Sequence, residues 1–207
     1  MKKLFFVMSF LSCCHPAELK TDVKSNAHTG ILIEDKEPVG VIPDDDCQQI
    51  DIGDKACNFR LTDQNGDTWD LYEHEGDVVL LDFSTVWCYP CQVAGHHTQT
   101  IQDQYQSEGF QFVTVLLEGS TAGEVPTDLE VDTWVTEHGV TTAPVLEGSK
   151  EKMIDPQTPG AVDVPGETGY LLNAYPTYIY IGRDLKFYAG HVGFSEDYIK
   201  QKIEEGL

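Results

Sequence analysis

Residues 78–92 read VVLLDFSTVWCYPCQ, an apolar run that leads directly into two cysteines separated by two residues. Apart from Asp82, the first part of this run is apolar on both faces, which is typical of a central strand buried on both sides. The segment that follows, Tyr89 to Gln106, has a helical pattern. The sequence therefore predicts that Cys88 and Cys91 lie where a buried strand gives way to a helix.

The segments around this junction complete a β-α-β unit. Gly109 closes the predicted helix, and Phe110 to Leu117 reads as a second buried strand. Upstream, two short alternating runs within residues 59–71 flank Asn65 and Gly66, which is a strong hairpin signal. These patterns indicate an α/β fold with a hairpin before its first central strand.

More elements are predicted toward the C-terminus. Residues 127–130 have the form of a capping box, so a helix follows, with His138 as a packing residue on its apolar face. Residues 148–170 are rich in Gly and Pro and are expected to form an insertion, either a functional loop or an ordinary surface segment. Two runs around residues 182–184 predict a second hairpin, and Ser195 is expected to cap a last helix.

The two cysteines suit dithiol chemistry because of their place at the start of a helix. Unpaired N–H groups and the helix dipole stabilise a thiolate there, so Cys88 is expected to be the nucleophile. Cys91, one turn further, can close a disulfide and is shielded by the helix, which makes it the resolving thiol. Pro90 fits between them, since the first helical turn tolerates a residue without an N–H group. We expect a redox-active Cys88–Cys91 disulfide and no other cofactor.

The run Val79-Leu80-Leu81-Asp82-Phe83 followed by Trp87-Cys88-Tyr89-Pro90-Cys91 resembles the thioredoxin superfamily. The preceding hairpin is similar to that of its envelope-facing branch, the membrane-anchored thiol-disulfide oxidoreductases of the cytochrome c maturation type. The resemblance covers roughly Cys57 to the C-terminus. It implies a thioredoxin-like fold, a central mixed β-sheet flanked by helices with an N-terminal β-hairpin extension. It also implies an enzyme that exchanges disulfides with protein clients and is reset by an envelope redox partner.

The resemblance extends to a second, distant part of the chain. In Asn173-Ala174-Tyr175-Pro176-Thr177, Pro176 matches the cis-proline that faces the active-site disulfide in thioredoxin-like folds. Cis X-Pro bonds are a few per cent of cases, so the residues alone would not indicate one. The substrate groove implied by this match is lined by Trp87, Tyr89, Pro90, Tyr175 and Pro176.

Asp82 is unusual because a carboxylate inside a buried strand is costly unless it has a role. Burial raises its pKa toward values useful for proton transfer. By resemblance, Asp82 matches a buried aspartate thought to help deprotonate the resolving cysteine, here Cys91. An aspartate that only bonds a neighbouring backbone group is the alternative.

The N-terminus has the features of an export signal. Met1-Lys2-Lys3 is a basic start, and an apolar segment too short to span a bilayer follows. This segment ends in Leu11-Ser12-Cys13-Cys14, which resembles the lipobox of bacterial lipoproteins. We expect a signal peptide over residues 1–14 and a lipid on Cys14, or alternatively on Cys13, with ordinary secretory cleavage as the other possibility. The protein would then be lipid-anchored on the periplasmic side of the bacterial cell envelope.

The remaining chain divides into an acidic flexible tether, residues 15–46, and a thioredoxin-like domain, residues 47–207. Cys47 and Cys57 lie outside the redox motif, in the exported part of the chain. An oxidising compartment preserves disulfides, so these two cysteines are expected to form a structural one.

The composition excludes some partners. With 41% hydrophobic and 23% charged residues the chain is expected to fold as a globular protein. Against 13 Lys and Arg stand 35 Asp and Glu, a net charge of −22 that opposes binding to a phosphate backbone. We therefore expect no nucleic acid partner. We also expect the protein to be a monomer.

A peroxidase is one alternative function. Thr85-Val86-Trp87-Cys88 has the Thr-x-x-Cys spacing of peroxiredoxins, in which the threonine hydroxyl helps to bind peroxide. The proline that this motif needs four residues before the threonine is replaced by Leu81. The second cysteine also follows the thioredoxin arrangement rather than that of peroxiredoxins.

A copper- or zinc-binding carrier is a second alternative, with Cys88, Cys91 and either His96 or His97 as ligands. The spacing from the second cysteine to either histidine is off the i, i+3 or i+4 positions that share a helix face. We therefore expect both histidines to face solvent. A binding module with an inactive cysteine pair is the remaining alternative.

Overall fold

The computed structural model describes residues 37–38, 40–42, 51–153 and 174–207. They belong to the second of two units of the chain, Asp35–Leu207. Outside the described residues lie the predicted signal peptide with Cys13 and Cys14, most of the predicted tether, Cys47, and residues 154–173. Among the described residues, no helix is both long and apolar enough to cross a bilayer.

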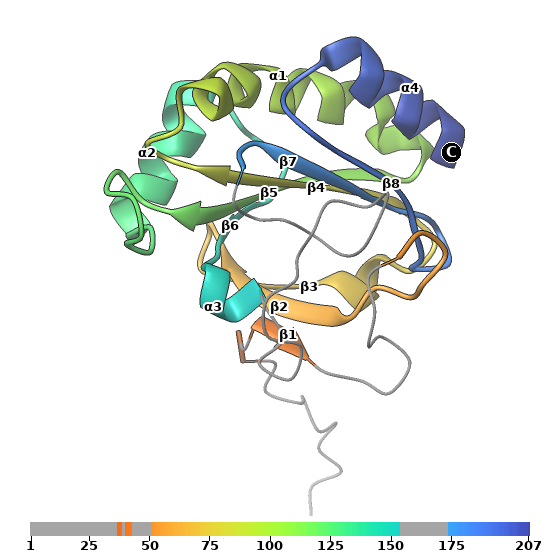
Figure 1. Cartoon of the computed structure of the whole chain (residues 1–207), viewed down its shortest axis with the longest axis horizontal. Coiled ribbons are helices and arrows are strands. Elements are labelled where there is room, and N and C mark those ends of the chain that lie inside the picture. The colour runs from red at the N-terminus through yellow and green to blue at the C-terminus, as the bar shows by residue number, and fades with distance from the viewer. Residues whose placement is uncertain (1–36, 39, 43–50, 154–173) are drawn as a thin grey trace, which may run out of the picture. The chain divides into compact units, whose positions relative to one another are not determined.

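The described strands form one mixed eight-stranded sheet (Figure 1). In chain order they are β1 Gly40–Ile42, β2 Asn58–Asp63, β3 Thr68–Asp70, β4 Val78–Thr85, β5 Phe110–Glu118, β6 Val145–Glu147, β7 Thr177–Ile181 and β8 Phe187–Val192. The helices are α1 Tyr89–Tyr105, α2 Asp128–His138, α3 Lys150–Met153 and α4 Glu196–Gly206, with short 3-10 turns η1 Leu71–His74 and η2 Gln106–Glu108.

The strand order is β1-β2-β6-β5-β4-β7-β8, with β3 paired to β2. Strands β4, β5 and β6 are parallel to one another, whereas β7 and β8 are antiparallel to their neighbours. Strand β4 is therefore central, between β5 and β7, and all eight of its residues are buried. This arrangement is the thioredoxin-like α/β fold that the resemblance implied, with the β2–β3 hairpin before the central strands.

Two hydrophobic cores lie on opposite faces of the central strands because side chains alternate along a strand. On β4, Val79, Leu81 and Phe83 face the core shared with β2 and β3. Val78 and Leu80 face the core shared with α1 and α4, which cover the same face of the sheet in Figure 1. Asp82 falls in the second series, so it points to the helical side, where Cys91 is also buried.

Several local predictions are confirmed. The buried strand, the helix after the cysteines and the second buried strand are β4, α1 and β5, and Gly109 ends η2 in the left-handed conformation. Both hydrogen bonds of the capping box between Thr127 and Glu130 are present at the start of α2. Strands β7 and β8 form the second hairpin.

Two predictions need correction, and a third concerns a segment that is only partly described. Gly40–Ile42, assigned to the flexible tether, forms strand β1 paired with β2, because backbone pairing at a sheet edge needs little side-chain pattern. Of the insertion predicted over residues 148–170, the described part contains the short helix α3. Ser195 occupies the N-cap position of α4, but its side chain makes no capping hydrogen bond.

Candidate active site

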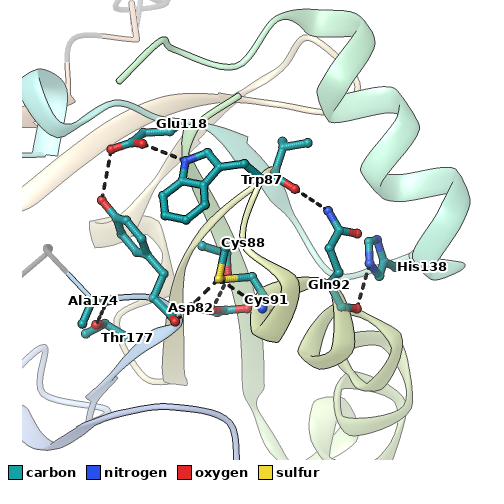
Figure 2. Close-up of a disulfide and its surroundings, with 12 residues drawn as sticks. Asp82, Trp87, Cys88, Cys91, Gln92, Glu118, His138, Ala174 and Thr177 are labelled. Atoms are coloured by element: carbon teal, nitrogen blue, oxygen red, sulfur yellow. Dashed lines mark hydrogen bonds between the residues drawn. A yellow bond between two sulfur atoms is a disulfide. The ribbon is translucent and has the colours of Figure 1, made fainter. Parts of the chain in front are cut away.

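The two cysteines form a disulfide at the N-terminus of α1, with their Cα atoms 5.2 Å apart (Figure 2). Cys88 is the N-cap residue, and its Sγ atom lies 3.3 Å from the backbone N–H of Cys91, which donates to it. Pro90 lies in the first turn of α1, where backbone N–H groups have no partner within the helix, so the N–H group that proline lacks is not needed. The strand-to-helix junction predicted from the sequence therefore holds the sulfur of Cys88 against the unpaired N–H groups of a helix.

The two sulfurs differ in their surroundings. Cys91 is completely buried under the helix, whereas Cys88 keeps 4% of its surface exposed. Around Cys88, the predicted groove residues Trp87, Tyr89 and Pro90 are exposed. Trp87 is 46% exposed and Tyr89 77%. This apolar rim leaves Cys88 as the sulfur nearer to solvent.

The second half of the site comes from the loop before β7. The Tyr175–Pro176 peptide bond is cis, as the resemblance implied. The carbonyl oxygen of Tyr175 lies 3.6 Å from the Sγ atom of Cys88. Thr177 holds this loop, since its hydroxyl donates to the carbonyl oxygen of Ala174 at 2.6 Å. Tyr175 is half-buried and Pro176 is buried, and the substrate groove expected around them stays a prediction.

Asp82 is fully buried on the helical side of β4. The hydroxyl of Ser84 donates a 2.7 Å hydrogen bond to its Oδ1 atom, while Oδ2 makes no hydrogen bond within the described part of the chain. Burial raises the pKa of Asp82 to about 7, although the bond from Ser84 lowers it somewhat. An acid with this pKa can accept and release a proton near neutral pH. The hydrogen bond of Asp82 goes to a side chain and not to the backbone group of the alternative interpretation.

A carboxylate that sequence reasoning missed, Glu118, lies next to Trp87, the residue before Cys88, and is 5% exposed. Its Oε2 atom accepts hydrogen bonds from the indole Nε1 of Trp87 at 2.8 Å and from the backbone N–H of Gly123 at 2.9 Å. Its Oε1 atom lies 2.7 Å from the ammonium of Lys150 and 3.5 Å from the hydroxyl of Tyr175. Burial alone would raise the pKa of Glu118, but these donors outweigh it and hold the pKa below its usual value.

One sequence signal could have identified Glu118. It is the last residue of β5, a parallel strand next to β4, and functional groups gather beyond the carboxyl ends of such strands. The cysteine motif follows the same end of β4. A carboxylate that ends an otherwise apolar strand beside the motif was therefore a candidate.

His138 packs α2 against the first turns of α1, as expected from the sequence. Its ring nitrogens lie 2.8 Å from the carbonyl oxygen of Trp134 and 3.0 Å from that of Gln92. Gly95 makes this approach possible, because a Cβ atom there would collide with the imidazole. Burial lowers the pKa of His138, and its backbone hydrogen bonds oppose that shift. Gln92 in turn donates to the carbonyl oxygen of Val86 at 2.6 Å, in the loop before the cysteines.

The two histidines of the metal-carrier alternative make their contacts with residues other than Cys88 and Cys91. His96 is exposed and its ring lies beside that of His138. His97 is only partly exposed, which corrects the prediction that it faces solvent, because it pairs with Glu196 at 2.9 Å and packs on Phe194. Within the described residues, no group of three His, Cys, Asp or Glu side chains could hold a metal ion.

Two further predictions concern Thr85 and Cys57. Thr85, the threonine of the peroxidase alternative, is fully buried at the end of β4, with its hydroxyl closed off from solvent. Cys57 is disulfide-bonded. Its expected partner Cys47 lies outside the described residues, so the Cys47–Cys57 pairing stays a prediction.

Comparisons with known proteins agree with this geometry. The model of the AhpC/TSA family matches residues 52–158, more than half of the chain. A protein named thiol-disulfide oxidoreductase ResA, from Oceanobacillus iheyensis, is 32% identical over 103 residues. That match covers 47% of this chain and 49% of ResA, so the chain spans about half the length of this relative.

Two solved structures are similar over a larger part of the chain. One, from Chlorobium tepidum, is described as the thiol:disulfide interchange protein DsbE, with 28% identity and a TM-score of 0.56. It covers 76% of this chain and 98% of that one. The other is an exposed lipoprotein thioredoxin from Streptococcus pneumoniae, with 25% identity and a TM-score of 0.55, covering 72% and 98% of the two chains.

Proposed function

Because the chain belongs to the AhpC/TSA family and has a thioredoxin-like fold, we propose that it is a thiol-disulfide oxidoreductase acting through Cys88 and Cys91. One observation carries the proposal: a disulfide at the N-terminus of α1 that faces the cis peptide bond before Pro176. The names of the similar proteins, ResA and DsbE, support the same activity. The disulfide itself is the redox centre, and the reaction needs no cofactor.

In the reducing direction, the thiolate of Cys88 attacks one sulfur of a client disulfide and the other client sulfur leaves as a thiolate. The N–H groups at the start of α1 stabilise the attacking thiolate, since they carry the positive end of the helix dipole. The product is a mixed disulfide between Cys88 and the client.

Cys91 then resolves this intermediate. Its proton passes to the carboxylate of Asp82, and its thiolate attacks the Sγ atom of Cys88, which forms the observed disulfide and releases the second client thiolate. Two electrons move from the cysteine pair to the client. The reverse sequence oxidises a client dithiol, and the same residues serve both directions.

The client and the cellular place are part of the proposal. Clients are protein thiols or disulfides, and a separate envelope redox partner resets the pair. The protein is an exported monomer, anchored to the envelope by a lipid on Cys14 or Cys13. The similarity to an exposed lipoprotein thioredoxin supports this anchor. Incorporation of a labelled fatty acid that is lost in the Cys13→Ala, Cys14→Ala double variant would test it.

Equilibration of the purified protein with mixtures of reduced and oxidised glutathione tests the activity. We expect a reversible transition in which Cys88 and Cys91 change together. Alkylation of the free thiols and measurement of the protein mass would report this transition. A cysteine pair that exchanges with neither form of glutathione would contradict the proposal. Hydrogen peroxide is the comparison substrate, because fast peroxide turnover would favour the peroxidase alternative.

A further inference from the structure

Glu118 reaches the active site because of an irregularity in the sheet. Strands β4 and β5 pair in register up to Ser84 and Leu116, but Thr85 pairs with Glu118, so one residue is skipped. A bulge of this kind turns a strand end and redirects its side chains, and such bulges occur next to active sites. Here it brings Glu118 next to the loop that leads to Cys88. The backbone carbonyl of Glu118 also accepts a 2.9 Å hydrogen bond from Val86 in that loop.

The groups around Glu118 keep its carboxylate in the ionised form. A buried carboxylate is costly unless charged or polar donors surround it. Glu118 has two such donors on each oxygen, at the distances given above. The pKa of Glu118 is correspondingly lowered, and that of Lys150 is raised by its bond to Glu118. The group therefore stays ionised at neutral pH, where a client would meet it.

Two of these donors belong to the two halves of the site. Trp87 directly precedes Cys88, and Tyr175 directly precedes the cis peptide bond to Pro176. Their rings meet edge to face, with centroids 6.1 Å apart and planes at 81°. Figure 2 shows Glu118 above the indole of Trp87, away from the disulfide. Glu118 thus joins the two halves of the site through Trp87 and Tyr175, without being a partner of either sulfur in the described structure.

Lys150 completes the arrangement from α3. Besides its contact with Glu118, its ammonium lies over the ring of Tyr175, 5.5 Å from the centroid. The same cation therefore neutralises the carboxylate and contacts the aromatic wall that the carboxylate holds. Removal of the charge on Glu118 would release Lys150 and Tyr175 together.

We propose that Glu118 is a positioning residue that fixes Trp87 against Tyr175 and so sets the affinity for protein clients. This inference rests on the proposed function. An exposed aromatic side chain that is already held in one orientation loses less freedom when a client binds. Because Glu118 does not touch the sulfurs, its loss should affect client binding and leave the sulfur chemistry unchanged.

The test compares Glu118→Gln with the wild-type full-length protein. Insulin serves as the protein disulfide, with dithiothreitol as the electron donor, and glutathione disulfide serves as the small substrate. We expect Glu118→Gln to raise the KM for insulin by about 10-fold, while kcat stays within about twofold. The rate with glutathione disulfide, which is much smaller than a protein client, should also stay within about twofold.

Two other variants make the comparison specific. Glu124→Gln removes a carboxylate from an exposed position in the loop after β5, so it controls for net charge and should leave the KM unchanged. Lys150→Met keeps the carboxylate but removes its cation, and it should raise the KM for insulin by less than Glu118→Gln does. An equal KM for insulin in the wild type and Glu118→Gln would overturn the role in client affinity.

A second measurement does not depend on turnover. The indole N–H resonance of Trp87 reports its hydrogen bond to Glu118, and we expect it to move in Glu118→Gln. The indole nitrogens of Trp69 and Trp134 make no hydrogen bond within the described residues, so their resonances serve as internal references. An unmoved Trp87 resonance would overturn the positioning role whatever the activity.

The two readouts separate this inference from the proposed function. If the wild type reduces neither insulin nor glutathione disulfide, the proposed function fails and the role in client affinity fails with it. The indole resonance then decides the positioning of Trp87 by itself. If the wild type reduces both substrates and Glu118→Gln does so with the same KM, only the inference fails.

Discussion

The Sγ atom of Cys88 lies 3.6 Å from the carbonyl oxygen of Tyr175, although the two residues are 87 positions apart in the chain. The pairing of β4 with β7 produces this contact, since Phe83 lies opposite Thr177 near the ends of the two strands. The peptide group before Pro176 therefore forms a wall of backbone next to the more exposed sulfur. Both halves of the site therefore depend on the sheet.

Asp82→Asn should slow the resolution of the mixed disulfide. In the proposed mechanism the carboxylate of Asp82 accepts the proton of Cys91, so the rate should rise with pH around the pKa of Asp82, about 7. The variant should lose this step and react about 100-fold more slowly at neutral pH, a typical effect of removing a general base. Stopped-flow measurement of the release of a fluorescent thiol from the Cys88 mixed disulfide would record the resolution rate of both proteins and its dependence on pH.

Ser84→Ala is the matched variant for the pH profile. The hydroxyl of Ser84 stabilises the charged form of Asp82 and lowers its pKa, so its removal should move the profile of the resolution rate to higher pH. The carboxylate itself remains, and the rate at high pH should approach that of the wild type. Identical profiles for the wild type, Ser84→Ala and Asp82→Asn would contradict a proton-accepting role for Asp82.

The burial of Asp82 should make the free energy of unfolding of the oxidised protein fall as pH rises. The unfolded chain releases this proton near the ordinary pKa of 3.8, whereas the folded chain holds it up to about pH 7. The folded state binds more protons between these values, so stability falls as pH rises through this window. Between pH 5 and pH 8 we expect the wild type to lose about 2 to 3 kcal/mol relative to Asp82→Asn. Urea unfolding of both proteins at several pH values would measure this, and a constant difference would contradict the buried charge.

Gly95→Ala should be destabilising, in contrast to the usual effect of this change within a helix. Alanine generally stabilises a helix interior by about 1 kcal/mol relative to glycine. At this position, however, the added Cβ atom would collide with the ring of His138. In a His138→Ala background the same substitution should therefore be neutral or stabilising. A double-mutant cycle of thermal unfolding measures the coupling, and additive effects of the two changes would contradict the close packing of α1 and α2.

Loss of the second disulfide should affect stability and not exchange. Cys57 is disulfide-bonded, and Cys47 is the partner expected from the sequence. A short loop of this kind contributes roughly 3 kcal/mol by its constraint on the unfolded chain. Cys47→Ser should lower the free energy of unfolding by about that amount, with unchanged glutathione equilibrium at Cys88 and Cys91. Free thiols at both Cys47 and Cys57 in the purified oxidised protein would exclude the pairing.

The part of the site that sequence reasoning found is encoded locally. The strand pattern, the two cysteines and the helical pattern are continuous between Val78 and Gln106, so their junction could be predicted without any long-range contact. Pro176 required the family resemblance, because no local pattern distinguishes a cis from a trans proline. Asp82 was conspicuous as a charge in an apolar strand, and its burial followed from that position.

The residues that sequence reasoning missed depend on contacts between distant segments. Glu118 reaches the site through a skipped residue in the β4–β5 register, and such a bulge has no signal in the sequence of either strand. Lys150 reaches Glu118 from α3, which lay within a segment interpreted as an insertion. Strand β1 forms by backbone pairing with β2, which the tether-like composition around it did not reveal.

The most direct test of the account is the fate of glutathione disulfide in two single-cysteine variants. In reduced Cys91→Ser, we expect Cys88 to form a mixed disulfide with one glutathione that persists, because the resolving thiol is absent. In reduced Cys88→Ser, the buried Cys91 should react about 100-fold more slowly. Intact mass spectrometry over time measures both. Equal rates in the two variants, or faster modification of Cys91, would contradict the assignment of Cys88 as the nucleophile.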